Sequence, residues 1–561
     1  MEETEGYRRS LVLLRAVTGP GGFTAAAEQT AASQHVWSRD GVVCGLAALL
    51  SGDQELIHAL ARTLNTLRNY QGPHGEVPSH VGDDGKVSYG SLAGRADSPL
   101  WYVIGVCALG RADPGVLAEH ETAVSRALWL TEAWEFNARG LVYVPLGGSW
   151  ADEYVLHGYL LSQQLLGLWA WRSAALAYGD NTFHAKAANL ESLLREEFWL
   201  RPEGRPVYHP MAYTTALEQR GPSRFWCAAF HPGGYDELFD GLANGLALMV
   251  GLGQGDEVSA HVKGLLERTG TDLVPAYDPP ITPDNHRWEA LTEYHTHGFR
   301  NRPGEYHNGG LWPMVNGFVA AGAGAFGERE LARRLADGID QANTADNWAF
   351  AEYHRAADRG PDGVRGAGGS AAAAVIARHA VEGRTPVEIT EGRVPVVLTE
   401  SRAAALAGRP AAASGRPGAW PARPSTPPPG ARPASPPPGT RPQGAPGSRP
   451  GSRPSPPPPP RGWPAGPSTG GSRPPTPPSP PPSSRPRPSG PPPNPQPRQP
   501  SPPPDDGWGP ASGPSLQGPS ARAQRSHGVT PRPAARPPAG DGFFSGQPNL
   551  NRLGPSTIRI R

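Results

Sequence analysis

Residues 160–169 read LLSQQLLGLW, a run in which apolar side chains return every three or four positions. This period places Leu161, Leu165 and Leu168 on one face of a helix. The same period recurs through most of the front part of the chain, whereas alternating strand-like runs are scarce. Further faces of this kind lie in residues 46–50, 57–64, 190–198, 238–250, 258–265, 331–339 and 371–379. The front part is therefore predicted to be all-α.

Three long connections separate these helical runs: residues 70–100, 202–238 and 274–313. They are rich in glycine, proline, aromatic and charged residues, and long connections in a compact domain usually serve function. Many helices joined by such loops indicate an all-α ring with a site at one mouth, although an irregular helical bundle fits the same pattern. A short hairpin is predicted for residues 386–399, after the last helix.

The composition changes near residue 396. Beyond it the chain holds 20 arginines against 4 acidic residues, which leaves 32 basic and 47 acidic residues in the front part. Residues 396–561 are predicted to be a disordered Pro/Arg-rich tail, because such a segment buries too little apolar surface to offset chain entropy. Runs such as PSPPPPPR suit modules that bind polyproline helices, or make the tail a simple linker. We expect a folded domain at residues 1–395.

Composition also excludes several classes of protein. The acidic front part would repel phosphate, which argues against nucleic acid as a ligand. The N-terminal MEETEGYRRS lacks an apolar signal core and no stretch is long enough to span a bilayer, so a cytoplasmic protein away from membranes is expected. Cys44, Cys107 and Cys227 are far apart and odd in number, as reduced buried thiols are. Apolar outer patches would allow a homo-oligomer.

Two loop clusters in the first half of the chain carry groups suited to sugars. Residues 35–41 read HVWSRDG, where Arg39 and Asp40 beside Trp37 can hold sugar hydroxyls. Residues 147–154 read GGSWADEY, where apolar bulk around Asp152 would favour its protonated form and suit a general acid. The structural alternative is the same for both carboxylates, since each precedes an apolar run and could cap a helix.

Two further clusters lie near the end of the front part. Residues 304–313 read GEYHNGGLWP, in which His, Asn and Trp can grip a sugar, or which form only a tight turn before a helix beginning near Pro313. Residues 347–354 read NWAFAEYH, in which Glu352 lies among aromatic rings and suits a base that orients water. The alternative for Glu352 is an ion pair with Arg355. No metal or organic cofactor is expected, since His295 and His297 lack a third spaced ligand.

Together the four clusters suit glycosidic cleavage, in which one carboxyl group protonates the leaving oxygen and another activates water or attacks the sugar. Asp152 and Glu352 are the candidate pair. Other carboxylates in the same region compete with them for these roles: Glu289, Glu293 and Glu305.

The order of these clusters resembles that of the alkaline/neutral invertases of glycoside hydrolase family 100, and more distantly the trehalases and family 63 glucosidases. The resemblance spans about residues 10–385, and EYHNGGLWP at residues 305–313, beside the family's SYHNGGSWP, is its most specific element. The other matching elements are WSRDG at 37–41, DSPLWY at 97–102, Asp152 followed by HGY at 157–159 with Gln164 in register, and WAFAEYH at 348–354.

The resemblance implies an (α/α)6 barrel with the site in its central funnel. It implies Asp152 as general acid and Glu352 as general base, with inversion at the anomeric carbon. It implies sugar contacts by Arg39, Asp40, Asp97, Gln164, His307 and Asn308. The aromatic and histidine residues of the same motifs complete the expected binding set: Trp37, Trp150, His157, Tyr306, Trp312 and Trp348.

The substrate expected first is a small glucoside, with sucrose leading. Glu153 and Tyr154 stand where the invertases carry two arginines after the catalytic Asp, so an exo-acting α-glucosidase on a glucan branch, a glucosyl- or mannosyl-glycerate or another oligosaccharide is the second hypothesis. The third is a carbohydrate-binding or scaffold protein without turnover, against which the intact pair of carboxylates argues.

Overall fold

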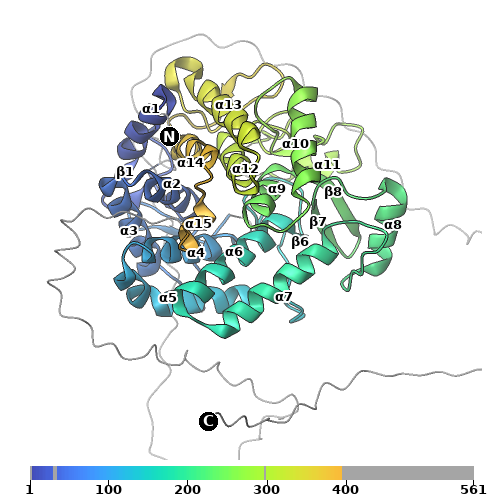
Figure 1. Cartoon of the computed structure of the whole chain (residues 1–561), viewed down its shortest axis with the longest axis horizontal. Coiled ribbons are helices and arrows are strands. Elements are labelled where there is room, and N and C mark those ends of the chain that lie inside the picture. Colours follow the sequence, from blue (N-terminus) through green and yellow to red (C-terminus); the bar gives the residue numbers. More distant parts are fainter. Residues whose placement is uncertain (1–2, 29–33, 92, 296–297, 394–561) are drawn as a thin grey trace, which may run out of the picture. The chain divides into compact units, whose positions relative to one another are not determined.

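The computed structural model of the chain describes residues 3–28, 34–91, 93–295 and 298–393 (Figure 1). The chain divides into a first unit, residues 1–433, and a second, residues 434–561. The second unit, the expected tail at 396–561 and its polyproline-like runs all lie outside the described residues. All described residues belong to the first unit.

Six helices form a closed inner ring, in which each helix packs against the next and the last against the first (Figure 1). In ring order they are α2 (Ser38–Ser51), α4 (Ser98–Gly110), α6 (Leu161–Tyr178), α9 (Gly241–Met249), α12 (Pro313–Phe326) and α14 (Gly368–Val381). The opening run LLSQQLLGLW is the start of α6. The ring is closed by α2 and α14, which come from opposite ends of the described chain.

Six further helices pack outside this ring, and each contacts at least one inner helix. They are α1 (Glu5–Ala16), α3 (Gln54–Asn69), α5 (Pro114–Ala133), α7 (Asn181–Glu197), α10 (Gly255–Thr269) and α13 (Arg329–Trp348). An inner ring of six and an outer layer of six is the (α/α)6 architecture. The expected fold class is confirmed, and the irregular bundle is excluded.

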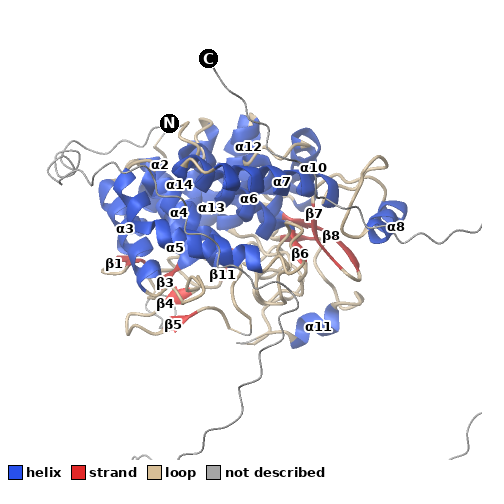
Figure 2. Ribbon diagram, turned by 90° about the horizontal axis from the view of Figure 1, so that it is seen from below, coloured by secondary structure: helices blue, strands red, loops and turns tan. Residues whose placement is uncertain are grey.

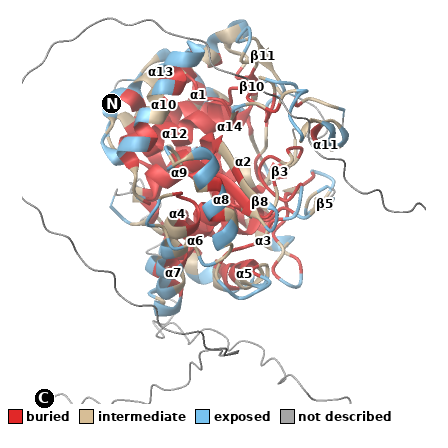
Figure 3. Cartoon of the chain, turned by 90° about the vertical axis from the view of Figure 1, so that its right-hand side faces the viewer, coloured by how far each residue is buried: buried red, intermediate tan, exposed pale blue. Residues whose placement is uncertain are grey.

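The inner and outer helices differ in how much of their surface is buried. All thirteen residues of α4 are buried, whereas α3 buries one apolar face that includes Leu56, Leu60 and Leu64 (Figure 3). A helix that is apolar all round belongs in a core, and an amphipathic one covers it. Small residues let the inner helices approach closely: a Cβ on Gly322 of α12 would lie 2.4 Å from the Gly245 carbonyl oxygen of α9.

The connections that precede the inner helices lie on one side of the helical layers (Figure 2). They carry short antiparallel sheets, β3–β4–β5, β6–β7–β8–β9 and β10–β11. The strands of these sheets are β3 (Val36–Trp37), β4 (His80–Val81), β5 (Val87–Ser88), β6 (Tyr159–Leu160), β7 (Cys227–His231), β8 (Gly234–Asp240), β9 (Tyr277–Asp278), β10 (Tyr353–His354) and β11 (Pro361–Asp362). A separate pair, β1 (Thr18–Gly19) and β2 (Gly22–Phe23), packs near α3. The ring therefore supports a layer of loops and sheets at the N-terminal ends of its inner helices.

The structure corrects several local predictions. The hairpin predicted for residues 386–399 is wrong over its described part, because Pro386–Thr390 form the short helix α15, whose Thr385 and Glu388 make a capping box. The connection at 202–238 holds α8 (Pro210–Arg220), β7 and most of β8, and Leu238 lies in that strand, since α9 begins only at Gly241 behind its Asp240 cap. The connection at 274–313 holds β9 and α11 (Trp288–Glu293).

The three cysteines are buried and free, as expected. Among the described residues, no helix is long and apolar enough to cross a membrane.

Candidate active site

A cavity of about 320 Å³ lies where α2, α12 and α14 begin. Its charged lining residues are Arg39, Asp40, Arg95, Asp152, Glu153, Arg300 and Glu352. Its aromatic and imidazole residues are Trp37, His80, Trp150, Tyr306, His307 and Trp312. An enclosed site with aromatic walls and a few convergent charges is typical of a small-molecule pocket. Both candidate catalytic carboxylates line this one cavity.

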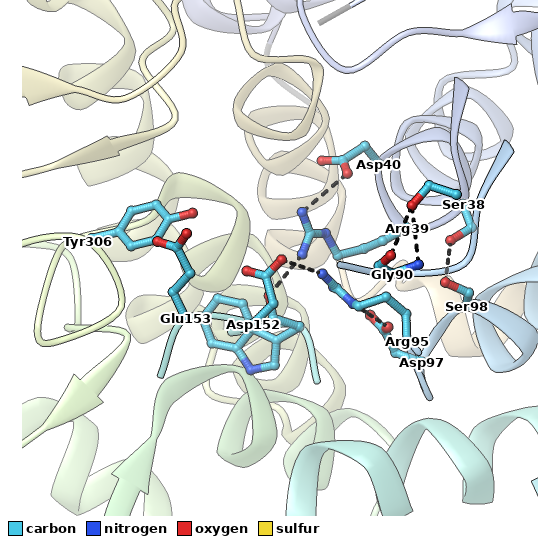
Figure 4. Close-up of polar contacts among 12 residues, drawn as sticks. Ser38, Arg39, Asp40, Gly90, Arg95, Asp97, Ser98, Asp152, Glu153 and Tyr306 are labelled. Carbon is cyan, nitrogen blue, oxygen red and sulfur yellow. Dashed lines mark hydrogen bonds and ion pairs between the residues drawn. The ribbon is translucent and has the colours of Figure 1, made fainter. Parts of the chain in front are cut away.

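Asp152 lies on the loop that leads to β6. Its Oδ2 accepts a hydrogen bond of 3.0 Å from Arg95 Nη1, and 32% of its side chain is exposed (Figure 4). The helix-cap alternative fails for Asp152, because α6 begins only at Leu161. The expected apolar surroundings are likewise absent at the carboxyl group itself, which faces a buried guanidinium.

Glu352 arrives from the other side of the ring, between α13 and β10. The backbone before it is unusual, since Asp346, Asn347, Trp348 and Phe350 all have positive φ values, between 45° and 64°. Such a run of left-handed residues is held only by the surrounding structure, and strained segments of this kind gather at functional sites.

Glu352 is partly buried where it lines the cavity. Burial raises its pKa above the ordinary value of 4.5, while Arg300 and a hydrogen bond of 3.3 Å from the Val364 N–H act in the opposite direction. The expected alternative, a pair with Arg355, is not formed, because Arg355 binds Asp358 and Asp362 instead. Among the described residues, Glu352 is therefore a partly buried acidic group without an ion pair to an arginine or lysine.

Arg39 and Asp40 form the floor of the cavity in the first turn of α2. Arg39 donates to Asp40 Oδ2 and to the Trp150 carbonyl oxygen, each at 3.2 Å. Asp40 does not cap the helix, since Trp37 occupies the N-cap position and makes no side-chain cap bond. Trp37 pairs with His80 across β3 and β4, and their rings lie 4.2 Å apart. These polar edges beside an aromatic face can bind a sugar.

An aromatic cluster walls the cavity on the α12 side. His307 stacks on Trp312 with ring centroids 5.3 Å apart, and Trp312 Nε1 donates to the Tyr306 carbonyl oxygen at 2.9 Å. Burial and the nearby Arg300 lower the pKa of His307 well below its ordinary value, so its ring is neutral. The predicted turn before α12 is confirmed, with Pro313 in its first turn. The cluster offers a neutral imidazole among aromatic faces.

Nine of the fourteen predicted site residues line the cavity, and five do not. The amide of Gln164 bonds the backbone N–H and C=O of Val142, and the amide of Asn308 bonds the backbone of Ile281 and Asn301. These two side chains therefore support loops.

The other three lie apart from the lining in different ways. His157 stacks on His231 of β7, Trp348 lies under the guanidinium of Arg9, and Asp97 is buried behind Arg95.

The rival carboxylates do not enter the cavity. Glu289 and Glu293 are exposed on α11, and Glu305 lies within 3.5 Å of Arg302. Among the described residues, no three His, Cys, Asp or Glu side chains are grouped so as to hold a metal ion, and His297 lies outside them.

Several lining residues were not predicted from the sequence, above all Arg95 and Arg300. Arg300 donates to Glu153 Oε2 at 3.0 Å and to the Tyr306 hydroxyl at 2.8 Å, with its guanidinium 3.8 Å from the centre of the Tyr306 ring. No local motif marks either arginine, although Arg95 stands two residues before the DSPLWY element.

The chain is similar in sequence to plant invertases. It is 25% identical over 417 residues to the alkaline/neutral invertase CINV1 of Arabidopsis thaliana, covering 63% of this chain and 74% of the relative. It is 24% identical over 414 residues to cytosolic invertase 1 of Oryza sativa subsp. japonica, covering 62% and 72%. No family model matches the chain.

Solved structures with similar coordinates include two glycosidases. One is the GH63 mannosylglycerate hydrolase of Thermus thermophilus, with 16% identity, a TM-score of 0.48 and coverage of 66% of this chain and 99% of that one. The other is a bacterial glucoamylase complexed with acarbose, with 16% identity, a TM-score of 0.48 and coverage of 70% and 58%. With its ring, its cavity and its invertase relatives, the chain is a glycoside hydrolase.

Proposed function

We propose that the chain hydrolyses a small glucoside, with sucrose the leading substrate, by inverting acid/base catalysis. Asp152 protonates the glycosidic oxygen, and Glu352 removes a proton from the attacking water. The observation that carries this proposal is that two loops far apart in the chain bring these two carboxyl groups into one aromatic-walled cavity. The sequence motifs around them support the order of roles.

The distribution of the lining residues supports an exo-acting enzyme. Asp40, Gly369 and Ser370 come from the first turns of inner helices and form the floor. Ser91 and Arg300 come from the connections and are more exposed, with 39% of the Arg300 side chain accessible against 18% for Asp40. A terminal sugar would occupy the floor, where Arg39 and Asp40 meet its hydroxyls. The leaving group would then face the loops, where Glu153 and Arg300 lie.

The same rim favours a second candidate substrate class. Glu153 is bound to Arg300 at the cavity, at a position where the invertase pattern has an arginine. An aglycone other than fructose, such as the glycerate of a glucosyl- or mannosyl-glycerate, would meet this pair. One relative, cytosolic invertase 1 of Oryza sativa subsp. japonica, is named for the cytosol, and we propose the cytoplasm for this chain as well.

The experiment is a sugar-release panel with the purified full chain on sucrose, maltose, short glucans and glucosyl- and mannosyl-glycerate. Equal glucose and fructose from sucrose supports the first candidate, and release only from another glycoside supports the second. Binding of these sugars without release of any product would overturn the proposal that the chain hydrolyses them. The anomer formed first, followed by NMR, tests inversion: retention of configuration would contradict it.

We also propose that residues 1–395 suffice for catalysis. A chain ending at residue 399 should keep the turnover number of the full chain, because every lining residue of the cavity precedes residue 371. Loss of soluble enzyme on truncation would assign the remaining residues a structural role.

A further inference from the structure

Arg95 joins two carboxylates of unequal exposure. It donates from Nε and Nη2 to the two oxygens of Asp97, at 3.2 and 3.4 Å, and from Nη1 to Asp152 Oδ2 at 3.0 Å (Figure 4). The side chains of Arg95 and Asp97 are only 7% and 3% exposed, whereas that of Asp152 is 32% exposed. One side of the guanidinium is therefore fixed by a buried partner, and the other reaches the cavity.

The backbone around Arg95 is fixed to the loop that carries Asp152. The Arg95 N–H donates to the Tyr89 carbonyl at 2.8 Å, and the Ala96 N–H donates to the Gly148 carbonyl at 2.8 Å. The Ala96 carbonyl in turn accepts a bond of 2.8 Å from Gln163 Nε2 of α6. The arginine and the carboxylate that it contacts thus belong to one rigid assembly.

The planar guanidinium suits this arrangement. Its fork binds a carboxylate through two parallel donors, which fixes orientation as well as distance. A buried arginine also needs a counter-charge, and Asp97 supplies it. Asp97 consequently sets both the direction of Arg95 and how much of its positive charge acts on Asp152.

We propose that Arg95, oriented by Asp97, is a positioning residue that holds the carboxyl group of Asp152 in place. Asp97, expected from the motifs to touch the sugar, acts instead through Arg95. This inference rests on the proposed function for the role of Asp152, and its geometry is independent of the substrate.

Two substitutions should act in opposite directions. Arg95→Gln removes a positive charge beside the proposed acid, so the alkaline limb of the pH profile of kcat should move to higher pH. Asp97→Asn leaves Arg95 with its full charge on Asp152, so the same limb moves to lower pH. Arg95→Lys keeps the charge without the fork, so kcat falls while the limb stays near that of wild type.

The experiment measures kcat against pH for the full chain and these three variants on sucrose, or on the panel glycoside that the wild type cleaves. A second substrate, α-glucosyl fluoride, has a leaving group that needs no proton. Arg95→Gln should lose about 100-fold in kcat on the natural glycoside, as expected for a misplaced catalytic group. It should stay close to wild type on the fluoride.

Asp340→Asn is the matched control. Asp340 pairs with Arg378 between α13 and α14 at 2.6 Å, with side chains 14% and 13% exposed, and it lies outside the cavity lining. Its substitution removes another largely buried Arg–Asp bridge, so it should lower the melting temperature without moving either pH limb.

Three results would separate the claims. Unmoved limbs in both Arg95→Gln and Asp97→Asn, or equal losses on the fluoride, would overturn the positioning role and indicate direct substrate binding by Arg95. Shifts of the acid limb in place of the alkaline limb, in the stated directions, would support the positioning role and overturn the assignment of Asp152 as the acid. No sugar release by the wild type from any substrate would overturn the proposed function instead.

Discussion

Asp152 and Glu352 share one cavity but stand in opposite surroundings. Asp152 is on a solvent-reachable loop, directly hydrogen-bonded to a buried arginine that Asp97 fixes. Glu352 is also partly buried, follows a strained backbone segment and accepts a hydrogen bond from a backbone N–H, with Arg300 acting on it from more than hydrogen-bond distance. One carboxylate is thus held by an arginine and the other by a backbone N–H.

The difference shows how one cavity can place two carboxyl groups in different electrostatic surroundings. A direct cation partner favours the charged form of a carboxyl group, and burial favours its neutral form. The cavity and its immediate support hold five carboxyl groups against three guanidinium groups. These are Asp40, Asp97, Asp152, Glu153 and Glu352 against Arg39, Arg95 and Arg300.

The largest expected effect is the loss of turnover. Asp152→Asn and Glu352→Gln should each lower kcat on the natural glycoside by about 10² to 10⁴-fold, because each removes a proton-transfer group. The measurement is kcat at saturating substrate, with melting temperatures to verify folding. Near wild-type activity in either variant would remove that residue from the pair.

A smaller effect should come from Arg300, the cation on the Glu352 side. It opposes the rise that burial causes in the pKa of Glu352, so Arg300→Gln should raise that pKa further. A base must be ionised, so the acid limb of kcat should move to higher pH in the variant and return in Arg300→Lys. An unmoved acid limb would show that Arg300 serves only Glu153 and Tyr306.

Prediction from sequence worked where the signal was local. The recurring leucines at the start of α6, where Ser162, Gln163 and Gln164 interrupt the apolar run, and the turn before Pro313 are visible in the sequence itself. Residues 98–110 gave no such signal, because α4 is buried on every side and has no polar face to set a period. Closure of the ring by α2 and α14 depends on contacts between residues far apart in the chain.

The candidate site likewise contains residues that sequence motifs predicted and residues that only the tertiary structure reveals. Motif order led to Asp152, Glu352 and His307, all of which line the cavity. It also led to Gln164 and Asn308, whose amides bond buried backbone groups, and a sequence motif does not distinguish such support from sugar contact. Arg95 and Arg300 were missed because arginines are common and only the tertiary structure places these two beside the carboxylates.

The smallest expected effect concerns stability, and it should differ in sign between the two carboxylates. The pKa of Glu352 is raised on folding, so its contribution to stability is complete below the unfolded pKa and is lost as pH rises through the folded pKa. Glu352→Gln should therefore melt above wild type at pH 8, with the gap closing as pH falls toward 4. Asp152→Asn should melt at or below wild type, because Arg95 loses a charged partner.

The assignment of acid and base is the central claim, because the raised pKa of Glu352 would by itself also suit a general acid. Hydrolysis of α-glucosyl fluoride by Asp152→Asn and Glu352→Gln decides between them, because fluoride leaves without a proton but water still needs a base. We predict that Asp152→Asn hydrolyses the fluoride at close to the wild-type rate and that Glu352→Gln does not. Hydrolysis by Glu352→Gln with none by Asp152→Asn would contradict the assignment.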